Sequence, residues 1–407
     1  MIHDRLHFNH QRLVAADGRH CQIQWCVRGE SAPMEVHAVA QTSVAEHFAD
    51  EIQRTAQRLT QELGWNWSRR HPEIIDVEVI DLGPGLAGAT LTDLHEVPYL
   101  RLSCRRFVAD DDLESRRRGN LILHEFVHLM QFGTDVWWSW PYHGSFGVSD
   151  PNNWLHESVA LATEAVYGTG TADWYPWLWK WAVAPHQSMD SDESGTRAAP
   201  FLIYLAQKLD LEFLADIYSD GNLAASPKYG TELLDSTIRG KSETASLCSM
   251  FTQFCAAWLC KATLWSPQAT GIQGIVGDRA NSEVVSAALF PNRTWRSEEW
   301  NLNHLACRYF AIRDLMASSP GTCDVSVVVA DNAAILKLSC IAMVLTPDGV
   351  PLQQLTLLCE SSNHLAGTLS IPAGPCQLRI VVVNTAHGPG WALHDDIRFQ
   401  VQCAWSE

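Results

Sequence analysis

Three residues with catalytic potential lie within five positions of one another, in the pentad His124-Glu125-Phe126-Val127-His128. On a helix, residues four apart project from the same face, one turn from each other. His124 and His128 therefore have the spacing that lets two imidazoles bind one zinc ion. Glu125 lies between them in the sequence and is able to take a proton from a zinc-bound water. The pentad predicts the metal centre of a hydrolase, provided that it lies on a helix and that a third ligand exists.

The sequence around the pentad favours a helix that packs against a core. Apolar residues recur through the segment 121–132, among them Leu121, Leu123, Phe126, Val127 and Met130. The aspartates at 110–112 are suitable caps for the start of such a helix, and Gly133 stands where it would end. The alternative interpretation is an amphipathic helix whose histidines are only polar side chains at its rim. A third ligand distinguishes the two.

The pattern HExxHxxGxxH, which supplies a third histidine from the same segment, is excluded. It needs a glycine at position 131 and a histidine at position 134, where this chain has Gln131 and Thr134. A second helix is expected downstream, over residues 152–164, with an asparagine at its start and glycines beyond its end.

The segment WLHESVALATE, residues 154–164, resembles the WLxEGxA…E helix of the gluzincin metallopeptidases. The resemblance implies that Glu157 is the third zinc ligand, and Ser158 stands where this family commonly has glycine. Glu164 follows seven residues later, two turns along the same face of the helix. Its carboxylate is placed to hydrogen-bond a ligating imidazole.

The resemblance extends over about residues 40–220. Expected strands at 74–82 and 97–104, followed by the HExxH helix, have the order of a gluzincin upper subdomain. Residues 200–205 resemble a helix that follows the active site in bacterial secreted members with a C-terminal β-domain. The resemblance implies a zincin-like catalytic domain, in which a mixed sheet and the active-site helix precede a helical subdomain.

Other residues compete with Glu157 as the third ligand. The segment GTADWY at 170–175 resembles the GTxDxxY segment of the aspzincins, which makes Asp173 a candidate. His143 and Asp150 are further candidates, as is the absence of a metal. His156 is next to Glu157 but points about 100° away from it on a helix.

Zinc bound by two imidazoles and one carboxylate keeps a position open for water and lowers the pKa of that water toward about 7. Glu125 would act as general base and pass the proton to the leaving amine. The developing oxyanion needs a hydrogen-bond donor, usually a tyrosine or a histidine. The candidates for this donor are Tyr204, Tyr175 and His143, followed by Tyr142 and Tyr229.

The chain of 407 residues, 46% of them hydrophobic, is long enough for two or three domains. We expect an α+β fold with a mixed N-terminal part of the catalytic domain at 1–110, a helical catalytic part at 111–300 and an antiparallel β-sandwich at 301–407. Helices are predicted at 43–63, 201–218, 233–238 and 245–264. Strands of the sandwich are predicted at 325–329, 335–345, 354–359, 365–371, 377–383 and 397–402. The segment 265–300 is interpreted as a linker or a processed loop.

Composition limits the partners and the compartment. The net charge of −17 disfavours nucleic acid and anionic membranes as partners, and no apolar run approaches the ~20 residues of a membrane span. The first residues lack the apolar stretch of a signal peptide. We therefore expect a cytoplasmic protein or one exported by a signal-independent route, or a secreted protein if the start is artificial. The twelve cysteines are scattered, which favours buried free thiols over disulfides, and most of the 17 tryptophans are expected in the core.

The sequence predicts a zinc metallopeptidase that acts on a protein or peptide substrate, bound as an extended strand along the segment 99–103. The oligomeric state is left open. One alternative is a non-catalytic binding protein on a zincin fold, and another is a zinc hydrolase of a non-peptide amide. A serine hydrolase is disfavoured, because the segment HGSFG at 143–147 lacks the first glycine of GxSxG.

Overall fold

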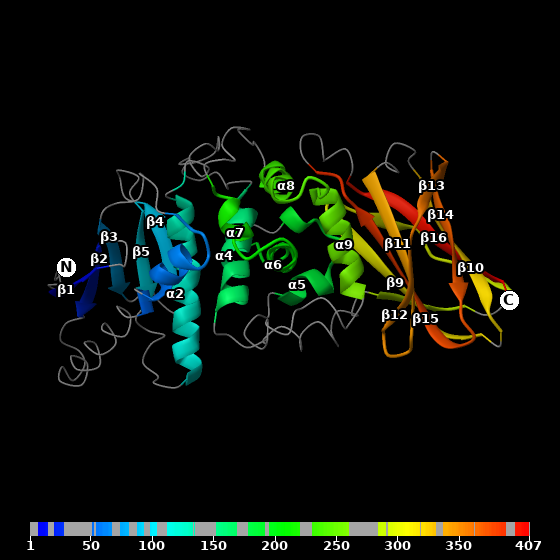
Figure 1. Ribbon diagram of the computed structural model, residues 1–407, viewed down its shortest axis with the longest axis horizontal. Helices are drawn as coiled ribbons and strands as arrows, with labels where there is room; N and C mark the ends of the chain where they lie inside the picture. The colour runs from blue at the N-terminus through cyan, green and yellow to red at the C-terminus, as the bar shows by residue number, and fades with distance from the viewer. Residues whose placement is uncertain are drawn as a thin grey trace, which may run out of the picture. The chain divides into compact units, whose positions relative to one another are not determined.

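The computed structural model describes residues 7–14, 20–27, 51–52, 54–66, 74–80, 88–92, 98–103, 112–132, 134, 152–168, 178–191, 195–219, 230–259, 284–289, 292–317, 319–330, 337–361, 363–387 and 395–406. They form helices and largely antiparallel sheets, which confirms the α+β class (Figure 1). No helix of this described part is both long enough and apolar enough to cross a membrane.

The chain forms two compact units, and each contains two separate stretches of sequence. The first unit comprises Met1–Gly170 and Asp210–Lys228, and the second comprises Thr171–Leu209 and Tyr229–Glu407. The three-part division at residues 110 and 300 remains a prediction.

The first unit contains a mixed five-stranded sheet in the order β1-β2-β3-β5-β4. Its strands are β1 (His7–Val14), β2 (His20–Val27), β3 (Ile74–Ile80), β4 (Gly88–Thr92) and β5 (Pro98–Ser103). The two central pairings, β2 with β3 and β3 with β5, are parallel, whereas β1 with β2 and β4 with β5 are antiparallel. Strands β3 and β5 lie where the sequence predicts strands. In the described part of the sheet, β4 is the edge strand next to β5.

Helix α2 (Asp112–Phe132) packs against β4, β5 and helix α4 (Asn153–Tyr167), as Figure 1 shows. Of the apolar positions of α2 that the sequence indicates, Leu123, Phe126, Val127 and Met130 are buried, whereas Leu121 is half-buried. α2 begins at Asp112, among the aspartates that the sequence indicates as its caps, and it ends at Phe132, directly before position 133.

The end of α4 lies close to α2 because it has no side chain at Gly168. A Cβ atom there would lie 2.5 Å from Oδ1 of Asn120, on α2. A short helix, α7 (Phe213–Asp216), also contacts α4 and comes from the second stretch of this unit. The helix predicted at 43–63 is described from residue 51, and residues 51–52 and 54–61 are helical.

The second unit contains a group of helices with an aromatic core. The helices are α5 (Leu178–Val183), η3 (Met189–Ser191), α6 (Ala199–Lys208), α8 (Gly230–Lys241) and α9 (Leu247–Leu259). Trp181, Phe201, Phe251 and Phe254 are fully buried, and their ring centroids lie 5.3–6.2 Å apart. The single helix predicted at 201–218 is wrong. α6 ends at Lys208, and the backbone turns at Asp210, whose carbonyl accepts the amide of Phe213, before α7 begins.

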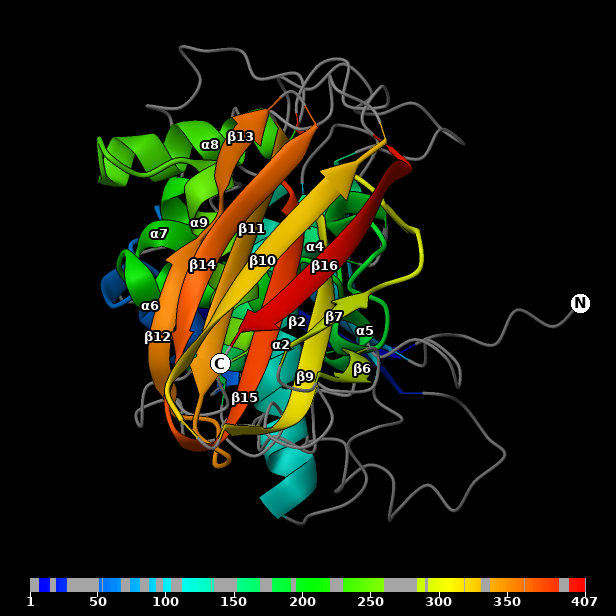
Figure 2. The same ribbon diagram turned by 90° about the vertical axis from the view of Figure 1, so that its right-hand side faces the viewer.

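A β-sandwich occupies the rest of the second unit (Figure 2). One sheet has the order β13-β14-β10-β16-β7, with β8 also paired to β16, and the other has the order β12-β11-β15-β9-β6. The strands are β6 (Val284–Ala288), β7 (Arg293–Arg296), β8 (Trp300–Leu302), β9 (Ala306–Ala317), β10 (Gly321–Val329), β11 (Leu338–Leu345), β12 (Pro351–Thr356), β13 (Leu358–Ser361), β14 (His364–Ile371), β15 (Gly374–Asn384) and β16 (Ile397–Ser406). The sheets therefore start at residue 284, inside the segment that the sequence marks as a linker. The pairing of β6 with β9 is parallel, unlike the other pairings of the sandwich.

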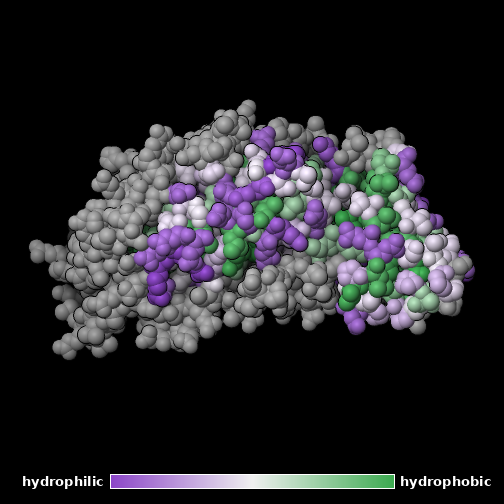
Figure 3. Space-filling view, viewed as in Figure 1, coloured by the Kyte–Doolittle hydropathy of each residue, from purple (hydrophilic) through white to green (hydrophobic). Residues whose placement is uncertain are grey.

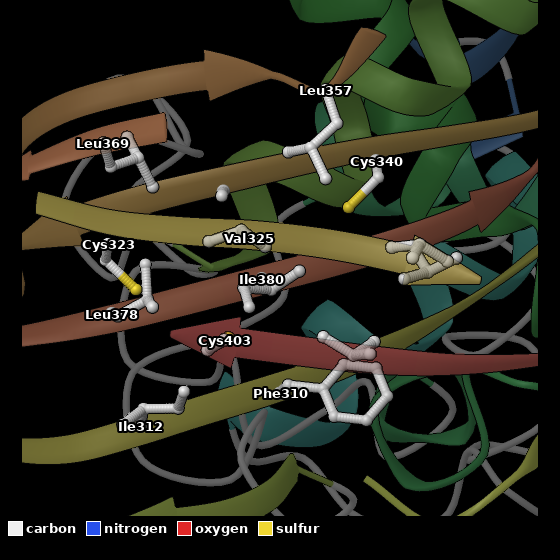
Figure 4. Close-up of a cluster of buried hydrophobic side chains, with 14 of the residues drawn as sticks. Phe310, Ile312, Cys323, Val325, Cys340, Leu357, Leu369, Leu378, Ile380 and Cys403 are labelled. Carbon is white, nitrogen blue, oxygen red and sulfur yellow. The ribbon is translucent and has the colours of Figure 1, made fainter. Parts of the chain in front are cut away.

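The two sheets enclose one hydrophobic core, part of which is drawn in Figure 4. On β10, every second residue from Cys323 to Val329 is buried, as expected for a strand with one face inward. Cys323, Cys340, Cys376 and Cys403 are buried free thiols, as predicted, whereas Cys359 is exposed on edge strand β13. On the face drawn in Figure 3, apolar residues of the sandwich surface are interspersed with polar ones.

Candidate metal centre

Helices α2 and α4 bring the side chains of His124, His128 and Glu157 together. The two histidine Nε2 atoms are 3.2 Å apart, and each lies 3.6 Å from a different oxygen of Glu157, Oε2 for His124 and Oε1 for His128. One ligand atom from each of the three residues lies within 4.8 Å of the other two. Ligand atoms about 2.0 Å from one zinc ion at tetrahedral angles would be separated by roughly 3.3 Å. The three groups therefore fit a single tetrahedral ion. In the described part of the chain, they form the one group of three His, Cys, Asp or Glu side chains arranged to hold a metal.

The helices fix this geometry because their opposite faces are buried. On α2, Ile122, Phe126 and Leu129 are fully enclosed, while His124 and His128 keep 15% and 11% of their side-chain surface. On α4, Leu155 and Val159 are fully buried, and Glu157 keeps 31%. The cluster is thus packed on one side and accessible on the other, as a site for small molecules requires.

The charges of the cluster indicate that it binds a cation. Burial alone would lower the pKa of His124, but hydrogen bonds to Glu157 and Glu164 raise it to about 10. Burial would also raise the pKa of Glu157, but the two imidazoles hold it well below its usual range. In the absence of a metal, a proton on His124 balances the carboxylates, and a metal ion is the other cation that suits these donors.

Each imidazole is oriented by an acceptor at its other nitrogen. Nδ1 of His124 lies 3.4 Å from Oε2 of Glu164, the position that the sequence assigns to such a carboxylate. Nδ1 of His128 lies 2.9 Å from Oε1 of Gln131, and Nε2 of Gln131 donates to the backbone oxygen of His156 at 3.1 Å. With Nδ1 donating, the lone pair of each Nε2 is left for a metal.

The sequence does not predict this role for Gln131, which is noted there only because the pattern HExxHxxGxxH needs a glycine at position 131. It lies three residues after His128 and therefore on the same face of the helix, and it is completely buried. That spacing is the signal that would have identified it.

Glu125 is buried against edge strand β4. Glu125 is only 6% exposed. The hydroxyl of Thr90 lies 2.9 Å from Oε2 of Glu125 and 2.8 Å from the backbone oxygen of Glu125. A Cβ atom at Gly88 would lie 2.9 Å from both Cγ and Oε1 of Glu125. Glycine is needed at this position because the carboxylate occupies the space that a side chain would take. Neither Gly88 nor Thr90 was singled out from the sequence, since only the tertiary fold brings β4 to α2.

The sequence also named candidates outside α2 and α4. His143 and Tyr175, together with the competitors Asp150, Asp173, Tyr142 and Tyr229, lie outside the described residues. Tyr204 is on α6 in the second unit, where it packs on Phe254 and where burial raises its pKa to about 12.

His156 is turned away from the cluster. Its Nδ1 atom is 2.7 Å from the hydroxyl of Tyr218, within the first unit. This position agrees with the sequence expectation that its side chain points away from Glu157.

The predicted docking strand also needs correction. Strand β5, which contains residues 99–103, is hydrogen-bonded on one side to β3 and on the other to β4. Among the described strands, β4 is the edge strand beside Glu125.

No protein-family model matches the chain, and no curated protein matches it. Among solved structures, the pre-peptidase C-terminal domain of a Bacillus anthracis collagenase is similar at 10% identity over 30% of this chain and 94% of that domain, with a TM-score of 0.19. Legionella pneumophila aminopeptidase A is similar at 11% identity over 91% of this chain, with a TM-score of 0.40, and a family GH115 4-O-methyl-α-glucuronidase at 8% over 72%, with a TM-score of 0.18. The chain spans only 36% and 38% of the last two. These similarities are too low to indicate a function for this chain. The functional assignment therefore depends on the geometry of the site.

Proposed function

We propose that this protein is a zinc-dependent metallopeptidase of the gluzincin type, with a zincin-like catalytic unit. His124, His128 and Glu157 bind the zinc ion, and Glu125 is the general base. The observation that carries this proposal is the approach of the two Nε2 atoms to 3.2 Å from each other and to 3.6 Å from one oxygen each of the Glu157 carboxylate, with an acceptor on the second nitrogen of each imidazole.

Zinc suits two imidazole nitrogens and one carboxylate, and when bound it supplies a Lewis acid and an acidified water. The chain supplies the base. Glu125 is held between α2 and β4, with Thr90 close to one carboxylate oxygen and no side chain at Gly88 to displace the other. A carboxylate fixed in this way can receive a proton from water and return it to the leaving amine without first having to be ordered.

The substrate is proposed to be a protein or peptide that binds in an extended form along β4. In the described part of the sheet, β4 pairs only with β5, so its other edge has backbone groups for an added strand. Gly88 and Thr90 lie on this strand next to Glu125, which would place an added peptide close to the base. Nucleic acid is not proposed as a partner, because a chain with a net charge of −17 repels a polyanion.

Zinc content combined with digestion of a peptide library tests the proposal. We expect one zinc per chain and peptide cleavage by the wild-type protein. Glu125→Gln should keep the zinc and the fold but lose nearly all turnover, by a factor of about 10² or more, because only proton transfer is removed.

Other outcomes would point to the alternatives. Bound zinc without turnover of any amide would indicate a binding protein on this fold, and turnover restricted to non-peptide amides would indicate the other hydrolase class. A protein that neither contains nor takes up zinc would contradict the proposal itself.

A further inference from the structure

A cysteine and a histidine lie together in the second unit, with no part in the metal centre. Cys248 is the second residue of α9, and its Sγ atom is 3.6 Å from Nδ1 of His387, which follows β15. Nδ1 of His387 is also 3.0 Å from the backbone oxygen of Thr385, which lies 3.5 Å from Sγ. Because the ring nitrogen has a carbonyl to donate to, it carries hydrogen and presents an N–H group to the sulfur as well.

The surroundings of this pair allow a negative sulfur. Burial would raise the pKa of Cys248, but the hydrogen bond from His387 lowers it below its usual value. In turn, the hydrogen bond to Cys248 raises the pKa of His387. The nearby charges come from α8: Asp235, which opposes a thiolate, and Arg239, whose Nε is 2.8 Å from Asp235 Oδ2 and offsets it.

Helix α9 also contributes to this environment. Asp235 Oδ1 accepts the amide of Leu247 at 2.7 Å, and Ser246 and Ser249 exchange hydrogen bonds between side chain and amide across the first turn. The helix therefore begins at a fixed point, directly before Cys248. The peptide dipoles of a helix favour negative charge in its first turn.

Cys248 is also accessible. It is partly exposed, as is His387, whereas the described cysteines of the sandwich core are buried. Cys359 is the one cysteine among the described residues that is classed as exposed, and its sulfur contacts the backbone oxygen of Ser361 at 3.2 Å. The chain thus contains an internal reference, a more exposed thiol whose described contact is a carbonyl.

We propose that Cys248 and His387 form a thiolate–imidazolium pair and that Cys248 is a thiol-exchange site for low-molecular-weight disulfides such as oxidised glutathione. The thiolate of Cys248 attacks one sulfur of the disulfide, the disulfide bond breaks, and a mixed disulfide forms on Cys248. The leaving thiolate takes the Nδ1 proton of His387 and departs as a thiol, so that charge and electrons balance. This inference does not depend on the proposed peptidase activity.

The experiment uses the full-length protein, with iodoacetamide and oxidised glutathione as probes and peptide mapping to separate the twelve cysteines. At about pH 6, Cys248 should be alkylated about tenfold faster than Cys359, although it is less exposed. His387→Gln should remove most of this advantage at about pH 6 and have little effect near pH 10, where ordinary thiols ionise as well. Oxidised glutathione should form a mixed disulfide on Cys248 in the wild type, more slowly in His387→Gln and not in Cys248→Ser.

Equal alkylation rates of Cys248 in the wild type and in folded His387→Gln at about pH 6 would overturn the proposal, as would the absence of a glutathione adduct on Cys248. If His387→Gln does not fold, the wild-type pH profile decides. A rate for Cys248 that keeps rising up to the usual thiol range near pH 8.5 would contradict the pair, and a plateau at lower pH would support it.

Discussion

Each imidazole of the metal centre has one nitrogen directed at the cluster and the other at an acceptor. The acceptors differ in kind: Glu164 is a carboxylate beside His124, and Gln131 is a neutral amide beside His128. Gln131 in addition joins α2 to α4 through the backbone oxygen of His156. A ligand and the groups that orient it therefore make different contributions to metal affinity, and substitutions separate them.

Glu157→Gln should weaken zinc binding far more than Glu164→Gln. The first substitution removes an anionic ligand, while the second leaves an amide oxygen that still accepts from Nδ1 of His124. We expect a loss in affinity of roughly 10–100-fold for a disturbed supporting group, and a larger loss for the ligand. Competition titration with a zinc chelator measures both, and equal losses in the two variants would argue against Glu157 as a ligand.

Gln131→Leu should also reduce zinc affinity, by about tenfold, although Gln131 is not expected to touch the metal. The leucine cannot accept from His128, and the backbone oxygen of His156 loses a donor. Gln131→Glu is the matched control, because it keeps an acceptor for His128. Unchanged affinity in Gln131→Leu would show that packing alone orients this histidine.

At the scale of elements, the helices and strands that depend on a local pattern of residues are predictable from the sequence. The apolar positions and the HExxH spacing indicated α2, and turn residues around alternating strands indicated most of the sandwich. The break between α6 and α7 was not predicted, because residues 201–218 are apolar at helical spacing throughout and only the turn at Asp210 divides them. The contacts of Gly88 and Thr90 with Glu125 were not predictable either, since they join positions about 35 residues apart through tertiary packing.

The edge strand β4 offers a test that leaves the metal ligands untouched. Gly88→Val should reduce peptidase turnover by about tenfold or more, because the new side chain displaces the carboxylate of Glu125. Zinc affinity should stay near the wild-type value. Ala89→Val, at the next position of β4, is the control, since successive side chains of a strand point to opposite faces. Equal effects of the two substitutions would mean that the strand, and not the space at Gly88, is responsible.

Another group of side chains joins separate segments of the second unit around His304. Its Nδ1 and Nε2 atoms lie 2.7 Å from Asp395 and from Asp190, respectively, and Nε2 is 2.8 Å from the hydroxyl of Ser188. In space, the hydroxyl of Ser188, the imidazole of His304 and the carboxylate of Asp395 follow one another as the three groups of a hydrolytic triad do. Asp190 nevertheless accepts from the nitrogen that a triad needs as its base, and Ser188 is only 2% exposed. The group is therefore structural.

His304 should make the stability of this unit depend on pH. Burial would lower its pKa, but Asp190 and Asp395 raise it above the usual value, so the imidazolium is favoured in the folded state. The stabilisation is full below the unfolded pKa of about 6.5 and is lost as the pH rises through the raised folded value. His304→Gln should lower the free energy of unfolding by about 3 kcal/mol at low pH and remove most of this pH dependence. Denaturant unfolding at several pH values measures it, and an unchanged pH profile in the variant would contradict the assignment.

At the scale of the molecule, the candidate metal centre belongs to one compact unit, and the sandwich belongs to the other. A ligand that binds only the folded form stabilises the unit to which it binds, by about 2.7 kcal/mol at a hundredfold excess over its Kd. The two units are therefore expected to respond differently to the same metal.

Calorimetry with added zinc or with a chelator tests this expectation. Zinc should raise the unfolding temperature of the first unit by several degrees and leave the transition of the second unit in place. The pH dependence from His304 should appear in the second transition, which identifies it independently. A zinc-induced shift of both transitions by the same amount would show that the units unfold as one.

The first unit consists of two separate stretches of the sequence. The chain leaves it after Gly170 and returns at Asp210, and this returning stretch contributes α7 and Tyr218, whose hydroxyl lies 2.7 Å from His156. A gene fragment ending at codon 170 would encode the proposed zinc ligands without the residues that pack behind them. Recombination could transfer the first unit to another gene intact only together with codons 171–209, which belong to the second unit, so the two units are expected to be inherited together.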